Sequence, residues 1–142
     1  MNYSRIGLAA IAGTIVFFVC GFLIFGLLIG SDFAPYGAVY RSQAGMQQHA
    51  PVGMVSSLIA MLVMSIMYAK GYEGGSGVLE GFRFGALVGL FLACKCVADE
   101  YVTLNIGGKL ALEMAAGVLV EMAIVGMVIG MVYKPKAGAA VV

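Results

Sequence analysis

The sequence predicts an all-α integral membrane protein, a four-helix bundle whose helices run up, down, up and down through the bilayer. Composition is the first observation behind this prediction. Hydrophobic residues fill 62% of the 142 positions and charged residues 11%, whereas soluble domains carry about 25% charged residues. With a mean hydropathy of +1.02, the chain has too few polar groups to cover a surface in water. Lipid is therefore its expected solvent.

The second observation is a set of apolar runs long enough to cross a membrane. A hydrocarbon core of about 30 Å needs about 20 helical residues, and backbone amides in lipid must be satisfied within the segment, which favours helices. The expected spans are residues 6–30, 52–69, 79–98 and 110–133 of a single transmembrane domain. The first run exceeds the 7–15 apolar residues of a signal peptide, so we expect a retained span. Pro51 is expected in the first turn of the second helix.

The connecting segments predict the orientation. Residues 31–50 form the expected outer loop, part of which, near residues 39–48, can form a short surface helix. Lys and Arg gather at the N-terminus, around the turn after the second span, and at the C-terminus, as Arg5, Lys70, Arg83, Lys134 and Lys136. By the positive-inside rule both termini are expected in the cytoplasm. All seven tyrosines fall at or beyond a span end, the usual place for a ring with an apolar body and a polar hydroxyl.

Glycines recur at intervals of four residues in three of the expected spans. Residues four apart lie on one face of a helix, and glycine there lets two helix backbones approach closely. Close packing matters in lipid because no hydrophobic effect drives helices together. The sequence leaves open whether the packing partner is within the chain or in another subunit. The expected helix-packing residues are Gly26, Gly30, Gly81, Gly85, Gly89, Gly126 and Gly130.

Three ionisable residues lie inside the expected spans. Glu121 is near the middle of the fourth span, where no basic residue of the chain is expected. A carboxylate without a partner in hydrocarbon is expected to carry a proton. It can then bond a hydroxyl such as Thr14, Ser56 or Ser57, or meet a cofactor, an ion or a partner subunit. Lys95 and Glu113 lie at similar depth near the outer ends of neighbouring spans, where they can pair or extend separately to the headgroups.

Other residues give weak indications of chemistry. Met46, His49 and Met54 suit copper by ligand type, and His49 is a possible ligand of a macrocycle, but the spacing is irregular. Cys20, Cys94 and Cys96 are expected to be packing residues. No nucleotide-binding, hydrolase or zinc motif is present in the sequence. We therefore predict no metal site and no enzyme; no cofactor is predicted, although haem, quinone and pigment stay open.

The chain is similar to a group of small bacterial membrane proteins of unknown function with four spans. The similarity covers roughly residues 38–135. It rests on Tyr40-Arg41, on Tyr68 to Gly77 (YAKGYEGGSG), on Glu80 to Gly85 (EGFRFG), on Glu121, and on the closing Val132-Tyr-Lys-Pro. The resemblance implies the four-span architecture and the bacterial inner membrane, and brings no activity with it. Cys94-Lys95-Cys96 departs from the uncharged stretch expected in such proteins.

Three functions are compatible with these observations. The first is a non-catalytic accessory or structural subunit that packs against other membrane proteins or against itself, in contact with membrane lipid. The second is a small oligomeric transporter or channel with Glu121 at the midplane. The third is a binder of a lipid-soluble cofactor. A net charge of +1 gives no basic surface for nucleic acid.

Overall fold

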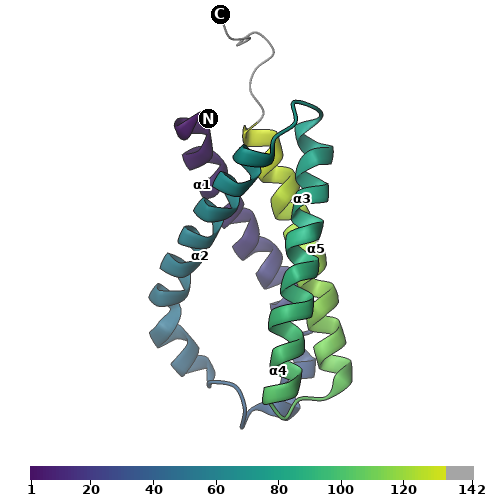
Figure 1. Ribbon diagram of the computed structural model, residues 1–142. Helices are drawn as coiled ribbons and strands as arrows, with labels where there is room; N and C mark the ends of the chain where they lie inside the picture. The colour runs from purple at the N-terminus through teal and green to yellow at the C-terminus, as the bar shows by residue number, and fades with distance from the viewer. Residues whose placement is uncertain (134–142) are drawn as a thin grey trace, which may run out of the picture.

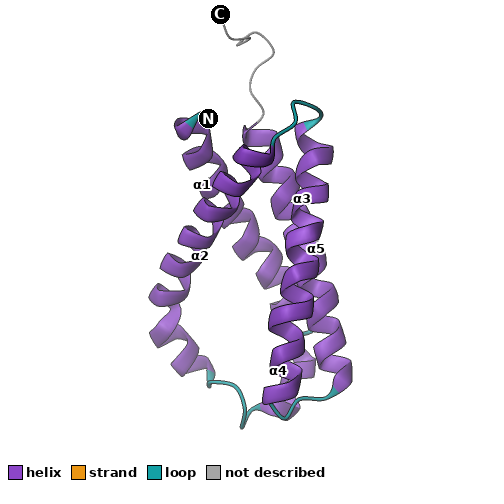
Figure 2. Ribbon diagram, in the orientation of Figure 1, coloured by secondary structure: helices purple, strands orange, loops and turns teal. Residues whose placement is uncertain are grey.

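The computed structural model describes residues 1–133, and this part of the chain is helical without strands (Figures 1 and 2). Its four passes are each long and apolar enough to cross a membrane. The helices are, in order, α1 (Tyr3–Gly21), the π-helix η1 (Phe22–Leu28), the 3₁₀-helix η2 (Gly30–Tyr36), α2 (Gln43–Gly71), α3 (Gly77–Leu92), the π-helix η3 (Ala93–Val97), α4 (Ala98–Thr103) and α5 (Gly108–Tyr133). The predicted all-α, multi-pass membrane fold is confirmed.

Successive passes alternate in direction, so the first and the last described residues, Met1 and Tyr133, lie at the same end of the bundle (Figure 1). The guanidinium of Arg5 donates a hydrogen bond to the backbone carbonyl of Tyr133, at 3.3 Å. We call this end, with Arg5 and Tyr133, the terminal end, and the other the opposite end. The assignment of the terminal end to the cytoplasm stays a prediction from the Lys and Arg distribution.

Helix α2 begins earlier than expected. It starts at Gln43, where the side chain of Ser42 accepts a hydrogen bond from the backbone N–H of Gly45 at 3.2 Å. This N-cap satisfies one of the free amides of the first turn, and residues expected in the outer loop become helical. The prediction that Pro51 opens the helix is therefore wrong, because Pro51 lies inside α2. With 29 residues, α2 is about 43 Å long, more than the hydrocarbon core needs.

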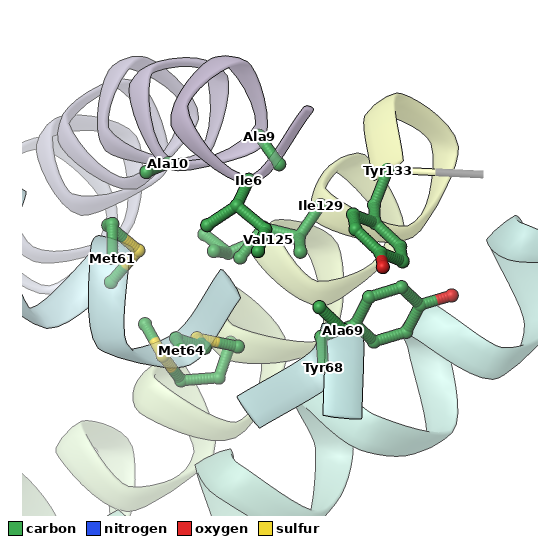
Figure 3. Packing of buried hydrophobic residues seen from close by; sticks show 11 residues of the cluster. Ile6, Ala9, Ala10, Met61, Met64, Tyr68, Ala69, Val125, Ile129 and Tyr133 are labelled. Atoms are coloured by element: carbon green, nitrogen blue, oxygen red, sulfur yellow. The ribbon is translucent and has the colours of Figure 1, made fainter. Parts of the chain in front are cut away.

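The core lies at the terminal end, where α1, α2 and α5 meet (Figure 3). Ile6, Val125 and Ile129 are at most 3% exposed and fill the space between α1 and α5. Met61 and Met64 of α2 close it from the third side. Because the flexible thioether side chain of Met adapts to irregular gaps, these two residues suit helices that cross at an angle.

An aromatic cluster covers this core toward the terminal end. The rings of Tyr68 and Tyr133 meet edge to face at 5.9 Å between centroids, and Phe84 and Tyr72 add further edge contacts. Tyr68 is 3% and Tyr133 5% exposed, so the expectation of headgroup contact is wrong for these two tyrosines. The hydroxyl of Tyr68 donates instead to the carbonyl of Gly77, at 3.4 Å, which gives its polar tip a partner inside the bundle.

The opposite half of the bundle is packed differently, because α2 leaves its neighbours there (Figure 1). From Gln43 to Ala60 every residue is exposed except Gly45 and Ser57, which are half-buried. Buried positions of α2 begin at Met61. The terminal half is therefore a four-helix bundle, whereas the opposite half consists of three packed passes with α2 standing apart.

The segment between η1 and α2 is fixed to α5. Lys109 forms an ion pair with Asp32 of η2 at 2.8 Å, and the backbone N–H of Gly107 donates to the hydroxyl of Tyr36 at 3.0 Å. Burial raises the pKa of Tyr40, and the nearby Glu100 carboxylate raises that pKa further. The expected outer loop is thus a short 3₁₀-helix held against the start of α5.

Candidate functional site

Helices α3 and α5 are joined along a seam of glycines. A Cβ atom placed on Gly81 would overlap the backbone of Gly126, and one on Gly85 would lie 2.9 Å from the Cα of Gly126. A Cβ on Gly130 would lie 3.0 Å from the Cα of Gly81, and one on Gly89 would lie 2.9 Å from the Cα of Leu119. The obstructing atoms are backbone, which cannot rotate away. The seam (Gly81, Gly85, Gly89, Gly126 and Gly130) therefore packs within the chain.

The other two glycines expected in packing lie elsewhere. The atoms nearest to a Cβ on Gly26 belong to the ring of Phe22, at 3.3 Å, and the one neighbour of a Cβ on Gly30 is the carbonyl of Phe25. Both contacts are within the same stretch of chain, so neither Gly26 nor Gly30 packs against a second helix of the described residues. The reason is local: η1 is a π-helix, and its i→i+5 bonding changes which residues share a face.

Glu121 lies inside the bundle, near the middle of α5. It is 3% exposed, and it is the one acidic or basic residue that is buried in the described part of the chain. Its Oε1 atom faces α1, because a Cβ built on Gly21 would lie 3.0 Å from that oxygen. Cys20, the preceding residue of α1, interacts electrostatically with the Glu121 carboxyl. The carboxyl therefore lies at the junction of α1 with η1.

This carboxyl oxygen lacks the partner that the sequence suggested. Oε1 of Glu121 makes no hydrogen bond within residues 1–133. Two of the three candidate hydroxyls are used locally: Thr14 donates to the carbonyl of Ala10 at 2.8 Å, and Ser56 donates to the carbonyl of Gly53 at 3.0 Å. Such back-bonding within a helix is common for Ser and Thr. An unsatisfied buried oxygen costs about 1–3 kcal/mol, and Oε1 of Glu121 is one of four buried side-chain oxygens in the described residues without a hydrogen-bond partner.

The two other intramembrane charges do not pair with each other. Lys95 pairs with Asp99 on its own helical pass, and both side chains are well exposed. Glu113 pairs with Lys109, one turn earlier on α5, at 3.3 Å. The possible Lys95–Glu113 pair is therefore absent, since each residue has an oppositely charged neighbour four positions away on the same pass.

His49 is exposed on the part of α2 that stands apart, and its Nδ1 is 2.8 Å from the carbonyl of Gly45. In the described residues no three His, Cys, Asp or Glu side chains gather in a way that could hold a metal ion. Cys20, Cys94 and Cys96 are free thiols. The structure thus brings together Glu121 with Gly21 and Cys20, whereas His49 belongs to no such group of three within the described residues.

Sequence reasoning missed the small residues that allow α1 and η1 to approach α5. A Cβ on Gly117 would lie 2.9 Å from Cγ2 of Ile24, and one on Gly13 would lie 3.2 Å from Cγ1 of Ile129. Neither Gly13 nor Gly117 has a glycine four residues away in the sequence. The available signal was the position of Gly117 one turn before Glu121, which places both on one face of α5.

Comparisons with known proteins give a family but no activity. Residues 8–130 match a family described as "Protein of unknown function (DUF1761)". The chain is also similar to polyketide synthase GfsA from Streptomyces halstedii, with 31% identity over 93 residues, which is 64% of this chain and 1% of that protein. No solved structure matches. Because the family match covers most of the chain, this protein belongs to the DUF1761 family of proteins of unknown function.

Proposed function

We propose that this protein is a non-catalytic subunit of the bacterial inner membrane, and that it assembles with another integral membrane protein or with a second copy of itself. The observation that carries the proposal is the separated half of α2. Residues Gln43–Ala60 are exposed around the helix except at Gly45 and Ser57, whereas α3 and α5 pack at backbone contact. In lipid, stabilisation comes from such close packing, and this half of α2 gains little of it from the described residues.

Local features of α2 suit a protein neighbour. Pro51 lies inside the helix, and proline has no N–H to donate to the carbonyl four residues earlier, here that of Gln47. That carbonyl is therefore left as an acceptor for a donor of the neighbouring protein. A shallow groove of about 440 Å³ runs beside Pro51, Val55 and Ile59. A helix of the neighbouring protein placed in this groove would supply the missing dispersion contacts.

Disulfide cross-linking in native membranes tests this proposal. The chain with Cys20, Cys94 and Cys96 replaced by Ser would carry one new cysteine, either V55C on the separated half of α2 or L87C on α3. Val55 and Leu87 are both well exposed, at 60% and 68%, so the pair separates assembly from mere exposure. We expect V55C to form a disulfide with a second protein chain and L87C to stay monomeric. Equal cross-linking of the two variants, or none at V55C, would remove the support for assembly through α2.

A further inference from the structure

We propose that Glu121 is a proton-binding site of this protein, which takes up and releases one proton through the half of the bundle that α2 leaves open. The proposal goes beyond assembly through α2 and does not depend on it. It rests on the partners of the carboxyl, on the groups around it, and on its level in the bundle.

Among the described residues, no ion pair or hydrogen bond stabilises a negative charge on Oε1 of Glu121. Glu121 is 3% exposed, its Oε1 accepts no hydrogen bond within the described residues, and the ion pairs of those residues do not include it. A charged carboxylate that lacks a cation and a hydrogen-bond donor is far more costly to bury than a neutral acid. A proton is therefore the ligand that the site binds in its buried state.

The elements packed around Glu121 offer few competing groups. On α1, the neighbouring titratable group is Cys20. No titratable side chain occurs in residues 52–67 of α2, in residues 84–92 of α3 or in η1. On α5 itself, the next acid is Glu113, which is two turns away and paired with Lys109. Proton uptake at this level is therefore a property of Glu121, modulated by one thiol.

The level of Glu121 in the bundle connects it with the opposite half. Gly13 of α1 lies against Ile129 of α5 and Met61 of α2. Toward the opposite end, Gly21 lies eight residues after Gly13 on α1, and Glu121 lies eight residues before Ile129 on α5. The Glu121 carboxyl faces Gly21. Eight back from Met61 is Gly53, and a Cβ there would have no heavy atom within 4 Å. At the level of the carboxyl, α2 has therefore left the bundle. Glu121 lies at the boundary between the packed half and the open half.

Gly21 keeps the space beside Oε1 free. Any larger residue would place a Cβ about 3.0 Å from that oxygen, where a proton donor or a water molecule has to approach during exchange. The regular α-helix also ends at Gly21, and η1 begins at Phe22. Departures of this kind from α-helical bonding are frequent at functional sites. Gly21 is therefore a positioning residue for the exchange.

Infrared spectroscopy of the full chain in phosphatidylcholine and phosphatidylglycerol vesicles tests the proposal. A protonated carboxylic acid has a carbonyl stretch apart from the amide band, and it shifts when deuterium replaces the proton. We expect one such band in the wild-type protein, shifted in D₂O and lost reversibly as the pH rises. Glu121→Gln removes it, and Glu113→Gln, the matched control, retains it.

Two results would overturn the proposal. A Glu121 band that neither shifts in D₂O nor responds to pH would make the carboxyl a sealed structural acid. A spectrum identical in the wild type and in Glu121→Gln would mean that the carboxyl is charged throughout. Should Glu121→Gln not fold, Glu121→Asp keeps an acid and must move the band rather than abolish it. Gly21→Ala, which encroaches on Oε1, is expected to move the same band, whereas Gly7→Ala, where a Cβ meets no atom within 4 Å, is not.

Discussion

Substitution of Gly126 by alanine tests the glycine seam most sharply. The new Cβ would lie 2.6 Å from the Cα and 2.8 Å from the backbone nitrogen of Gly85. The carbonyl oxygen of Gly81 would lie closer still. Ordinary contact begins near 3.4 Å, so α3 and α5 must separate by about 1 Å, and a gap of that size forfeits about half of the dispersion energy across it. Because lipid adds no hydrophobic drive to restore the contact, we expect a loss of about 1–3 kcal/mol, the usual cost of overpacking.

The assay is reversible unfolding in mixed micelles, with the Gly7→Ala variant as the matched control. A Cβ at Gly7 meets no atom within 4 Å, and alanine favours a helix over glycine by about 1 kcal/mol, so this control should be neutral or slightly stabilising. Gly26→Ala should behave like the control, because the ring of Phe22 can rotate away. Equal stability of Gly126→Ala and Gly7→Ala would refute the reasoning that backbone contact holds α3 to α5.

Three further predictions concern other parts of the fold. Tyr68→Phe should cost less than 1 kcal/mol, because the bond to the carbonyl of Gly77 is long at 3.4 Å, whereas Tyr68→Ala should cost about 3–5 kcal/mol; the same unfolding assay compares them. Lys95→Ala should leave the melting temperature unchanged, since its ion pair with Asp99 is exposed, and a clear drop would contradict this. The pKa of Tyr40 is raised above its ordinary value of 10.0, so the stabilisation from its neutral hydroxyl is fully present below that pH. It is lost as the pH rises further, because the unfolded chain gives up this proton first. Tyr40→Phe should reduce the loss, as measured by melting temperatures at increasing pH.

Composition was sufficient to predict the medium and the fold class, because a chain this apolar has one viable solvent. Helix ends were less predictable. The start of α2 depends on one local hydrogen bond, between the side chain of Ser42 and the amide of Gly45, and it outweighed the expectation from Pro51. Hydropathy responds to the apolar run and not to the cap, so the sequence allowed a separate short helix near residues 39–48 rather than an extension of α2 through Gln47 and Gln48.

The glycine spacing predicted which faces pack but could not name the partner. A period of four residues places Gly81, Gly85 and Gly89 on one face of any regular helix, and the structure places Gly126 and Gly130 opposite them. At Gly26 the same spacing brings no second helix of the described residues into contact, and the backbone there is π-helical. Nothing in the sequence of Phe22–Leu28 marks a π-helix.

The depth of Glu121 followed from counting residues along its span, but its surroundings did not. Whether a hydroxyl reaches the carboxyl depends on where α2 lies, and the sequence of α2 does not indicate that its first half leaves the bundle. Ser56 was a reasonable partner at the right depth. The separation of α2 at Gly53 removes Ser56 from reach, and the hydroxyl bonds its own backbone instead.

The most direct test of the account asks whether the helices cross a membrane in alternating directions. Single cysteines would replace Gln48, near the start of α2, and Glu73, in the turn before α3, in a chain whose natural cysteines are replaced; both positions are exposed. A membrane-impermeant maleimide should label the Gln48 variant in intact cells. It should label the Glu73 variant only after the cells have been permeabilised. Labelling of both variants from the same side would contradict the four-span bundle from which every other inference follows.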